Sequence, residues 1–399
     1  MNADEPRRVA QIHNAPRRGV LVVTGGGSGA IAALLGQPGA SRTVLEASVP
    51  YSLAALRDWL GGAVESACSA ATARAMAMAA FRRAQTLESA KGDAGDQSDA
   101  ELFGVACTAS LASDRPKRGD HRVHVAVQTA AQTAEWSLLL DKDKRTRGEE
   151  EAVACQLVLH AVAVAAGVHD ADADVTYAEP RGGDRLETRC LAAPRFLVPL
   201  IAGGGAALLQ PGDTPFAPAE ESGYQRVLMP GAFAPSHAGH WQMLEHAAGR
   251  LGAPVTLELC TANVDKPPLD FLSLADRLRG IAGTFGAGVQ VWVTSYPTFL
   301  EKAERLGVQT FVVGADTITR IADPRYYGND PATRNAAIAR MRGLGVGFLV
   351  FGRLRGERFE SLDDLRLPPA LRAMCDGVAE SDFRQDISST ELRAARRRA

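Results

Sequence analysis

The sequence has few cysteines, no strong excess of charge of one sign and no long apolar run, and each shortage excludes a class of protein. The six cysteines are scattered without a Cys-x-x-Cys pair, which argues against a zinc knuckle and is typical of reduced thiols in the cytoplasm. A formal net charge of -2 leaves no general basic field for nucleic acid. The polar start does not resemble a signal peptide, and no segment is apolar enough to span a membrane. We therefore expect a cytoplasmic protein that binds neither nucleic acid nor membrane.

The length and composition are those of a globular protein with more than one domain. A chain of 399 residues, 46% hydrophobic and 23% charged, is too long for one ordinary core. Proline, glycine and acidic residues gather at 210–223, which predicts a linker. We expect a first domain over 15–205, a linker over 206–224 and a second domain over 225–399.

An apolar strand, a Pro-Gly turn and two histidines follow one another early in the second domain. The strand is Val227–Met229, and apolar residues over 241–251 recur at helical spacing. At such a turn the backbone N–H groups and the helix dipole attract an anion, and His237 and His240 add imidazole donors. Nucleotidyl transfer needs donors of this kind around the α-phosphate. The alternative is that two histidines merely stand near a helix start.

A second candidate anion site lies near the end of the chain. Residues 382–393 form an extended run into a serine and threonine cap, where Ser388 has Glu391 at capping-box spacing. Hydroxyls, unpaired N–H groups and Arg393 one turn into the helix would surround an anion. The alternative is an ordinary capped helix with a solvated basic tail.

Three motifs in this order resemble the signatures of the HxGH nucleotidyltransferases, most closely the nicotinamide mononucleotide adenylyltransferases. They are Gly231–His240, Thr310–Asp316 and Ile387–Arg393. The resemblance implies that His237 and His240 bind the triphosphate and, with Arg393, stabilise the transition state. One departure is Ala234, where the family usually carries Asp or Asn.

The same resemblance implies further ligand-binding residues. Lys266 stands where relatives carry a lysine that faces the second substrate's phosphate. No residue is implied as a metal ligand. The residues implied to bind the nucleotide, with Gly314 and Asp316 at the adenosine and the hydroxyl residues at the phosphates, are Gly231, Ala232, Phe233, Gly314, Asp316, Ile387, Ser388, Ser389 and Thr390.

Apolar runs and helical patterns alternate through the second half. Such alternation predicts a parallel, doubly wound, Rossmann-like sheet with its ligand at the carboxyl ends of the strands, so we expect two α/β domains. The predicted strands are Val255–Leu259, Val289–Thr294, Thr310–Val313 and Gly347–Phe351, and the predicted helices are Leu269–Ile281, Phe299–Leu306 and Ala332–Leu344.

A strand, a glycine loop and a helix over Gly19–Ala32 favour, at first sight, a dinucleotide site. The segment resembles the start of a short-chain dehydrogenase. However, Ile31 stands where those enzymes need a glycine, and none of the six tyrosines has a lysine four residues later. A working dehydrogenase is therefore disfavoured.

The first half resembles more closely the C-terminal domain of CinA, a family that includes nicotinamide mononucleotide deamidases. Counted without gaps, the family's serine nucleophile falls on Thr24 and its lysine on Leu56. An amide hydrolase without its activating base loses its covalent route, so the resemblance implies a degenerate domain with a structural, oligomeric or ligand-sensing role. Retained hydrolysis is the alternative. The resemblance rests on short motifs at 27–33, 37–41, 50–52, 104–109, 118–126 and 144–147.

The leading hypothesis is transfer of AMP from ATP to a phosphorylated acceptor with release of pyrophosphate. The resemblance implies nicotinamide or nicotinate mononucleotide as acceptor, and hence a part in NAD biosynthesis. Mg²⁺ would accompany ATP, held through phosphate and water. The CinA-like half suggests a homo-oligomer. Two alternatives stay open: a nucleotide-binding regulatory or assembly protein with little turnover, and a first domain that still deamidates nicotinamide mononucleotide.

Overall fold

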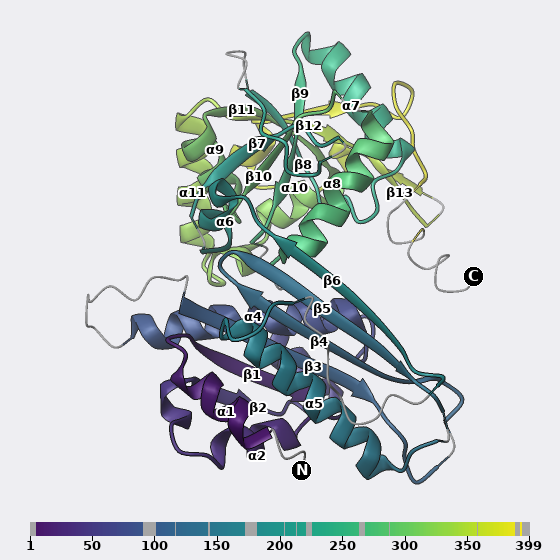
Figure 1. Cartoon of the computed structure of the whole chain (residues 1–399). Helices are drawn as coiled ribbons and strands as arrows, with labels where there is room; N and C mark the ends of the chain where they lie inside the picture. The colour runs from purple at the N-terminus through teal and green to yellow at the C-terminus, as the bar shows by residue number, and fades with distance from the viewer. Residues whose placement is uncertain are drawn as a thin grey trace. The chain divides into compact units, whose positions relative to one another are not determined.

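A computed structural model describes residues 5–90, 101–115, 117–142, 144–171, 182–202, 204–212, 214–220, 226–262, 268–286, 288–356, 358–387 and 392. By their contacts the residues divide into two units (Figure 1), which are Met1–Ala202 with Asp265–Leu274, and Gly203–Val264 with Ala275–Ala399. Each unit contains its own sheet, so the prediction of two α/β domains as a fold class is confirmed. Within the described ranges, no helix is both long and apolar enough to cross a membrane.

The first unit is built on a mixed sheet. Parallel pairing joins the first three strands in space, and antiparallel pairing joins the rest. In spatial order the six strands are β2 (Val44–Ser48), β1 (Arg18–Thr24), β3 (Leu102–Ser110), β4 (His121–Thr129), β5 (Gln132–Leu140) and β6 (Arg185–Ala192).

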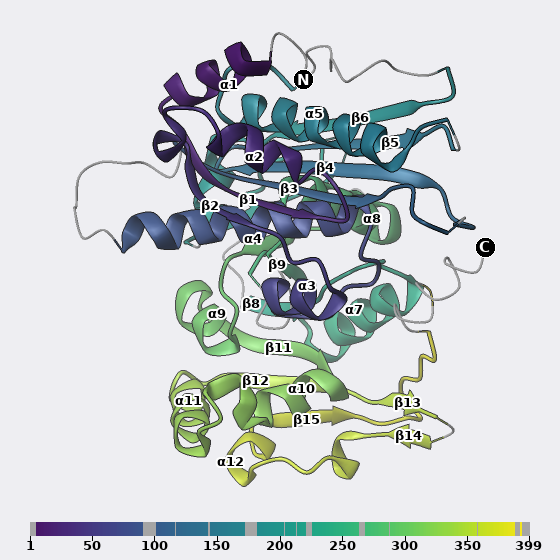
Figure 2. The same cartoon turned by 90° about the horizontal axis from the view of Figure 1, so that it is seen from below.

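Helices cover both faces of this sheet. Figures 1 and 2 show α4 (Ala70–Ser89) on one face and α1 (Glu5–Asn14), α2 (Gly29–Leu35) and α5 (Arg147–Ala165) on the other. Because both faces are covered, β1 and β3 are buried along almost their whole length. The shorter elements are η1 (Ala40–Arg42), α3 (Leu53–Leu60), η3 (Arg195–Leu197) and α6 (Val198–Ala202).

The second unit has the predicted parallel, doubly wound sheet. All neighbouring strands pair in parallel except β7, which joins the edge antiparallel. In spatial order the seven strands are β15 (Cys375–Val378), β12 (Gly347–Phe351), β11 (Val308–Gly314), β8 (Arg226–Pro230), β9 (Val255–Cys260), β10 (Val291–Thr294) and β7 (Ala206–Leu209). The chain goes from β8 to β9 on one side and later returns to β11 on the other, which places a topological switch point between β8 and β11.

The helices of this unit lie close to their predicted positions. Phe299–Leu306 has the predicted bounds, whereas the helix predicted over 269–281 begins at Phe271, because the Asp270 carboxylate accepts the Ser273 N–H at 2.8 Å and caps the helix there. The elements are α7 (Ala238–Leu251), α8 (Phe271–Phe285), α9 (Phe299–Leu306), α10 (Ala315–Ala322), η4 (Pro324–Tyr327), α11 (Pro331–Gly343), β13 (Arg353–Arg355), β14 (Arg358–Glu360), η5 (Leu362–Asp364) and α12 (Pro369–Arg372).

The segment predicted as a linker, 206–224, differs from the prediction at its start. Residues Ala206–Leu209 form β7, which pairs with β10, and both leucines are buried. The run Ala-Ala-Leu-Leu is apolar, and the proline and acidic residues typical of a linker begin only after it. The end of this segment, 221–224, lies outside the described residues.

Candidate active site

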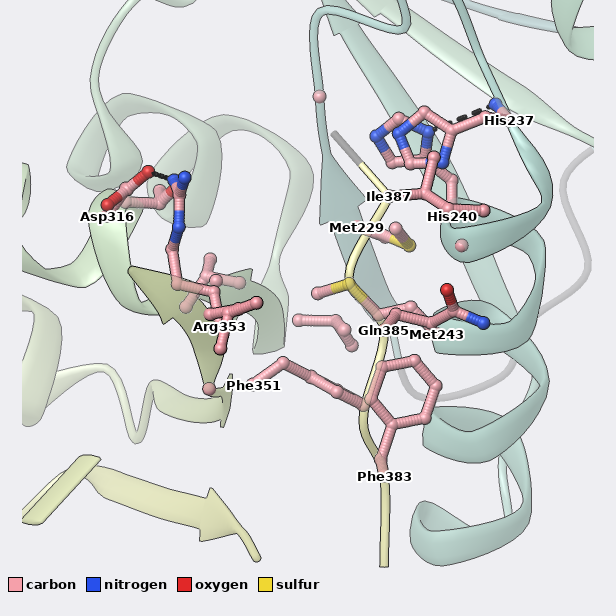
Figure 3. Close-up of a pocket in the computed structure, with 18 of the residues that line it drawn as sticks. Met229, His237, His240, Met243, Asp316, Phe351, Arg353, Phe383, Gln385 and Ile387 are labelled. Atoms are coloured by element: carbon pink, nitrogen blue, oxygen red, sulfur yellow. Dashed lines mark hydrogen bonds and ion pairs between the residues drawn. The ribbon is translucent and has the colours of Figure 1, made fainter. Parts of the chain in front are cut away.

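A cavity of about 500 Å³ opens at the carboxyl ends of β8, β11 and β12 in the second unit (Figure 3). Its lining comes from the turn after β8, the first turns of α7, the start of α10, the hairpin after β12 and the segment 383–387. The cavity therefore lies beside the switch point of the sheet, where open α/β folds bind their ligands.

Two residues fix the turn between β8 and α7. A Cβ atom at Gly231 would lie 2.6 Å from the Phe233 ring, so a larger residue there would displace the ring. Phe233 has a φ of 44°, a left-handed conformation that is uncommon outside glycine, and its buried ring meets His240 edge to face at 5.3 Å. The Ala232 carbonyl accepts a hydrogen bond of 3.1 Å from Arg277. These contacts fix the backbone conformation of the turn that precedes the histidines.

The loop around Ala234 is held by a neighbouring residue. The Ser236 hydroxyl lies 2.8 Å from both the Gly280 carbonyl and the Thr284 hydroxyl, which are on α8. These contacts attach the loop to α8 directly before His237. The departure from the family at Ala234 is therefore accompanied by a local anchor two residues later.

His237 and His240 stack on each other at the start of α7. Their ring centroids lie 3.8 Å apart with the planes 31° from parallel. The His237 backbone N–H donates to His240 Nδ1 at 3.3 Å, which places the proton of a neutral His240 ring on Nε2. A Cβ at Gly239 would lie 3.1 Å from His237 Nδ1, so the glycine between the histidines lets this ring lie against the helix.

Burial decides the charge of these two rings. It lowers the pKa of His240 to about 4, with a further contribution from the neighbouring His237, and it also lowers the pKa of His237. Both side chains are therefore neutral at pH 7 in the protein without a ligand. In that state each ring offers a hydrogen-bond donor rather than a positive charge.

The Gly-x-Asp motif lies across neighbouring strand ends from an arginine. Gly314 at the end of β11 is in register with Phe351 at the end of β12. Two residues beyond each, Asp316 and Arg353 form an ion pair that Figure 3 draws apart from the histidines. Arg353 was not predicted as a site residue from the sequence, although its place just after an apolar strand of a parallel sheet was a usable signal.

A group of apolar side chains lines another part of the cavity. Figure 3 shows Met229, Met243, Phe351 and Phe383 grouped below the histidine pair. Phe383 packs edge to face on Phe351 at 4.9 Å, and this contact holds the segment 383–387 against the cavity. A flat apolar surface of this kind suits a nucleobase or nicotinamide ring.

The cavity brings together many residues that the sequence singled out. Ala232 lies on the turn without lining the cavity, while Gly231, Phe233, His237, His240, Gly314, Asp316 and Ile387 all line it. The remaining predicted residues, Lys266, Ser388, Ser389, Thr390 and Arg393, lie outside the described residues.

The glycine loop of the first unit is filled by a carboxylate of its own chain. Glu151 on α5 accepts hydrogen bonds from the Gly27 N–H and the Ser28 hydroxyl, both at 3.0 Å, and from the Gly29 N–H at 3.4 Å. Burial raises the pKa of Glu151, but these hydrogen bonds outweigh it and lower the pKa. The N–H and hydroxyl donors that a dinucleotide phosphate would use are thus occupied. This agrees with the sequence-based argument against a working dehydrogenase.

A smaller cavity of about 310 Å³ adjoins this loop. Thr24 lines it, and its hydroxyl donates to the Pro50 carbonyl at 3.0 Å. Leu56, which stands at the position of the family's lysine, is buried, and the described lining of this cavity includes no lysine. Glu151 is the carboxylate in the cavity, and with a lowered pKa it is a weak base.

Comparisons with known proteins follow the same division of the chain. Residues 228–395, which include every lining residue of the larger cavity, match the cytidylyltransferase-like family model. No curated protein matches the chain.

The N-terminal half matches solved structures of the CinA superfamily. The competence/damage inducible protein CihA from Agrobacterium tumefaciens is 21% identical, with a TM-score of 0.31, over 42% of this chain and 97% of that one. A CinA superfamily protein from Klebsiella pneumoniae is 22% identical, with a TM-score of 0.30, over 41% of this chain and 94% of that one. The predicted resemblance of the second half to nucleotidyltransferases is confirmed, and the cytidylyltransferase-like domain over residues 228–395 supports an enzyme of the nucleotidyltransferase type.

Proposed function

We propose that the second unit transfers AMP from ATP to a phosphorylated acceptor, nicotinamide mononucleotide or nicotinate mononucleotide, and releases pyrophosphate. The convergence of two distant motifs in one cavity supports this proposal. His237 and His240 come from the start of α7, Gly314 from the end of β11 and Asp316 from the start of α10. With either acceptor the product is a dinucleotide, which belongs to NAD biosynthesis.

The state of the histidines suits this reaction. An oxygen of the acceptor phosphate forms a bond to the α-phosphorus while the bond from that phosphorus to the bridging oxygen of pyrophosphate breaks. The attacking oxygen is already anionic, so no general base is needed. Negative charge grows on the α-phosphate oxygens, and the neutral His240 Nε2–H and the N-terminus of α7 supply donors for them.

Mg²⁺ would enter with the triphosphate and neutralise part of its charge. The described residues contain no group of three or more His, Cys, Asp or Glu side chains that could hold an ion by themselves. Phosphate oxygens and water, which Mg²⁺ prefers as ligands, would hold the ion instead.

The test is pyrophosphate release from ATP with a panel of phosphorylated acceptors. We expect His240→Ala to reduce acceptor-dependent release by about 100-fold or more, because one lost donor to a developing oxyanion costs that much. Glu245→Ala, at an exposed position of the same helix, is the matched control and should keep full activity. ATP binding in calorimetry without release on any acceptor would instead favour a regulatory nucleotide-binding protein.

A further inference from the structure

The described lining of the larger cavity has little positive charge for a ligand that carries a triphosphate. His237 and His240 are neutral at pH 7, and Asp386 is acidic. Among the lining residues in the described ranges, Arg353 is the one arginine or lysine. A nucleotide in this cavity therefore has one described cationic side chain to meet.

Arg353 is held at the cavity by a tight hairpin. It begins β13, which pairs with β14, and it follows Gly352, where a Cβ atom would lie 2.4 Å from the Phe359 ring. Its guanidinium is paired with the Asp316 carboxylate, and both side chains are 44% exposed. Solvent screens ion pairs with this exposure, so they contribute little stability. The pair is thus held at the cavity but only weakly.

A triphosphate can compete with Asp316 for this guanidinium. Arginine binds phosphate oxygens through the same two parallel, charge-assisted N–H donors that it offers to a carboxylate. A triphosphate also brings more negative charge than one carboxylate. Exchange of the partner would free the Asp316 oxygens to accept hydrogen bonds from ligand hydroxyls.

We propose that Arg353 is a phosphate-binding residue that leaves Asp316 for the phosphate chain of the incoming nucleotide. This inference rests on the proposed function, because it assumes that the cavity receives a nucleotide. It makes the cavity selective: a nucleoside without phosphates must break the pair and gains nothing at Arg353, whereas a nucleoside triphosphate replaces the lost contact.

The test compares ATP with adenosine by titration calorimetry on the full chain. We expect Arg353→Gln to weaken ATP binding by about tenfold or more, while adenosine binds as it does to the unchanged protein or more tightly. Arg353→Lys should lose less, because it keeps the charge without the paired donors. Arg355→Gln is the matched control, since Arg355 lies on the same hairpin, is paired with Glu360 and does not line the cavity.

Two results would overturn the proposal. An equal loss of ATP and adenosine affinity in Arg353→Gln would reduce Arg353 to a residue that positions Asp316, and an unchanged ATP affinity would remove Arg353 from the site. Thermal melts of each variant exclude a folding defect. A failure of the proposed function would be seen separately. If ATP binding depends on Arg353 but no acceptor gives pyrophosphate release, AMP transfer is contradicted, while the exchange of Asp316 for phosphate at Arg353 is still supported.

Discussion

A glycine between the two histidines is the residue on which the geometry of the site depends most closely. A Cβ at Gly239 would lie 3.1 Å from His237 Nδ1 and 3.2 Å from Cε1, which is tighter than ordinary contact. We expect Gly239→Ala to displace the His237 ring and to lower the rate of pyrophosphate release by about 10- to 100-fold, because small misplacements are costly in catalysis.

Gly249→Ala is the control for this substitution. It lies on the same helix, and its added Cβ would meet no described atom within 4 Å. It should keep its activity and gain about 0.5–1 kcal/mol in free energy of unfolding, because alanine is the better helix former. Equal activity of the two variants would show that the position of the His237 ring does not matter.

A second prediction for a single residue is that His240 is uncharged at neutral pH. Its pKa is lowered from 6.5 to about 4, so the ring is deprotonated at every pH well above 4 and gains a proton only as the pH falls toward that value. In an NMR titration its imidazole resonances, assigned by their absence in His240→Gln, should not move between pH 8 and 5.5. A titration midpoint near pH 6.5 would contradict a neutral His240 at pH 7. Arg353 would then be less distinct as the cationic side chain of the cavity.

At the scale of elements, a buried ion pair joins strand β9 to helix α9. Glu258 on β9 accepts hydrogen bonds from Lys302 Nζ at 2.8 Å and from the Thr294 hydroxyl at 2.6 Å, and both charged side chains are buried. Lys302→Met leaves the carboxylate without its cation. We expect a loss of about 3–5 kcal/mol in free energy of unfolding, measured with urea.

An exposed pair on a neighbouring element provides the comparison. Arg340 on α11 bonds Glu304 on α9 at 2.8 Å, with side chains 63% and 38% exposed. Arg340→Met should cost less than about 1 kcal/mol, because solvent screens the pair. Similar losses of unfolding free energy in the two variants would show that burial does not determine how much the Glu258–Lys302 pair contributes to stability.

Elements were the most predictable part of this protein, for a physical reason. Strands buried on both faces are continuous apolar runs, so the strand Gly347–Phe351 has the bounds that the sequence predicts. The helix Phe299–Leu306 also has its predicted bounds, because its apolar residues recur at helical spacing. The strand Ala206–Leu209 was missed because its four residues stand directly before a Pro-rich and acidic stretch. Its pairing with β10 is a contact between distant segments, which a local pattern does not encode.

At the scale of the whole molecule, both α/β domains and their resemblances followed from motifs that are local in sequence. Partners far apart did not: Glu151 fills the glycine loop from 124 positions beyond Gly27, and Arg353 meets Asp316 only because β11 and β12 are neighbours. The loop sequence alone therefore looks like an open phosphate site. In the folded protein the Glu151 carboxylate fills that loop, and the larger cavity, which could hold a nucleotide, lies in the other unit.

The most direct measurement is the product formed by the full chain from ATP, Mg²⁺ and an equal mixture of nicotinamide and nicotinate mononucleotide, analysed by mass spectrometry. We expect a dinucleotide and pyrophosphate in equal amounts, with the yield reduced about 100-fold in His240→Ala. Dinucleotide formation that persists in His240→Ala, or the absence of any AMP-containing product from the unchanged protein, would contradict this expectation.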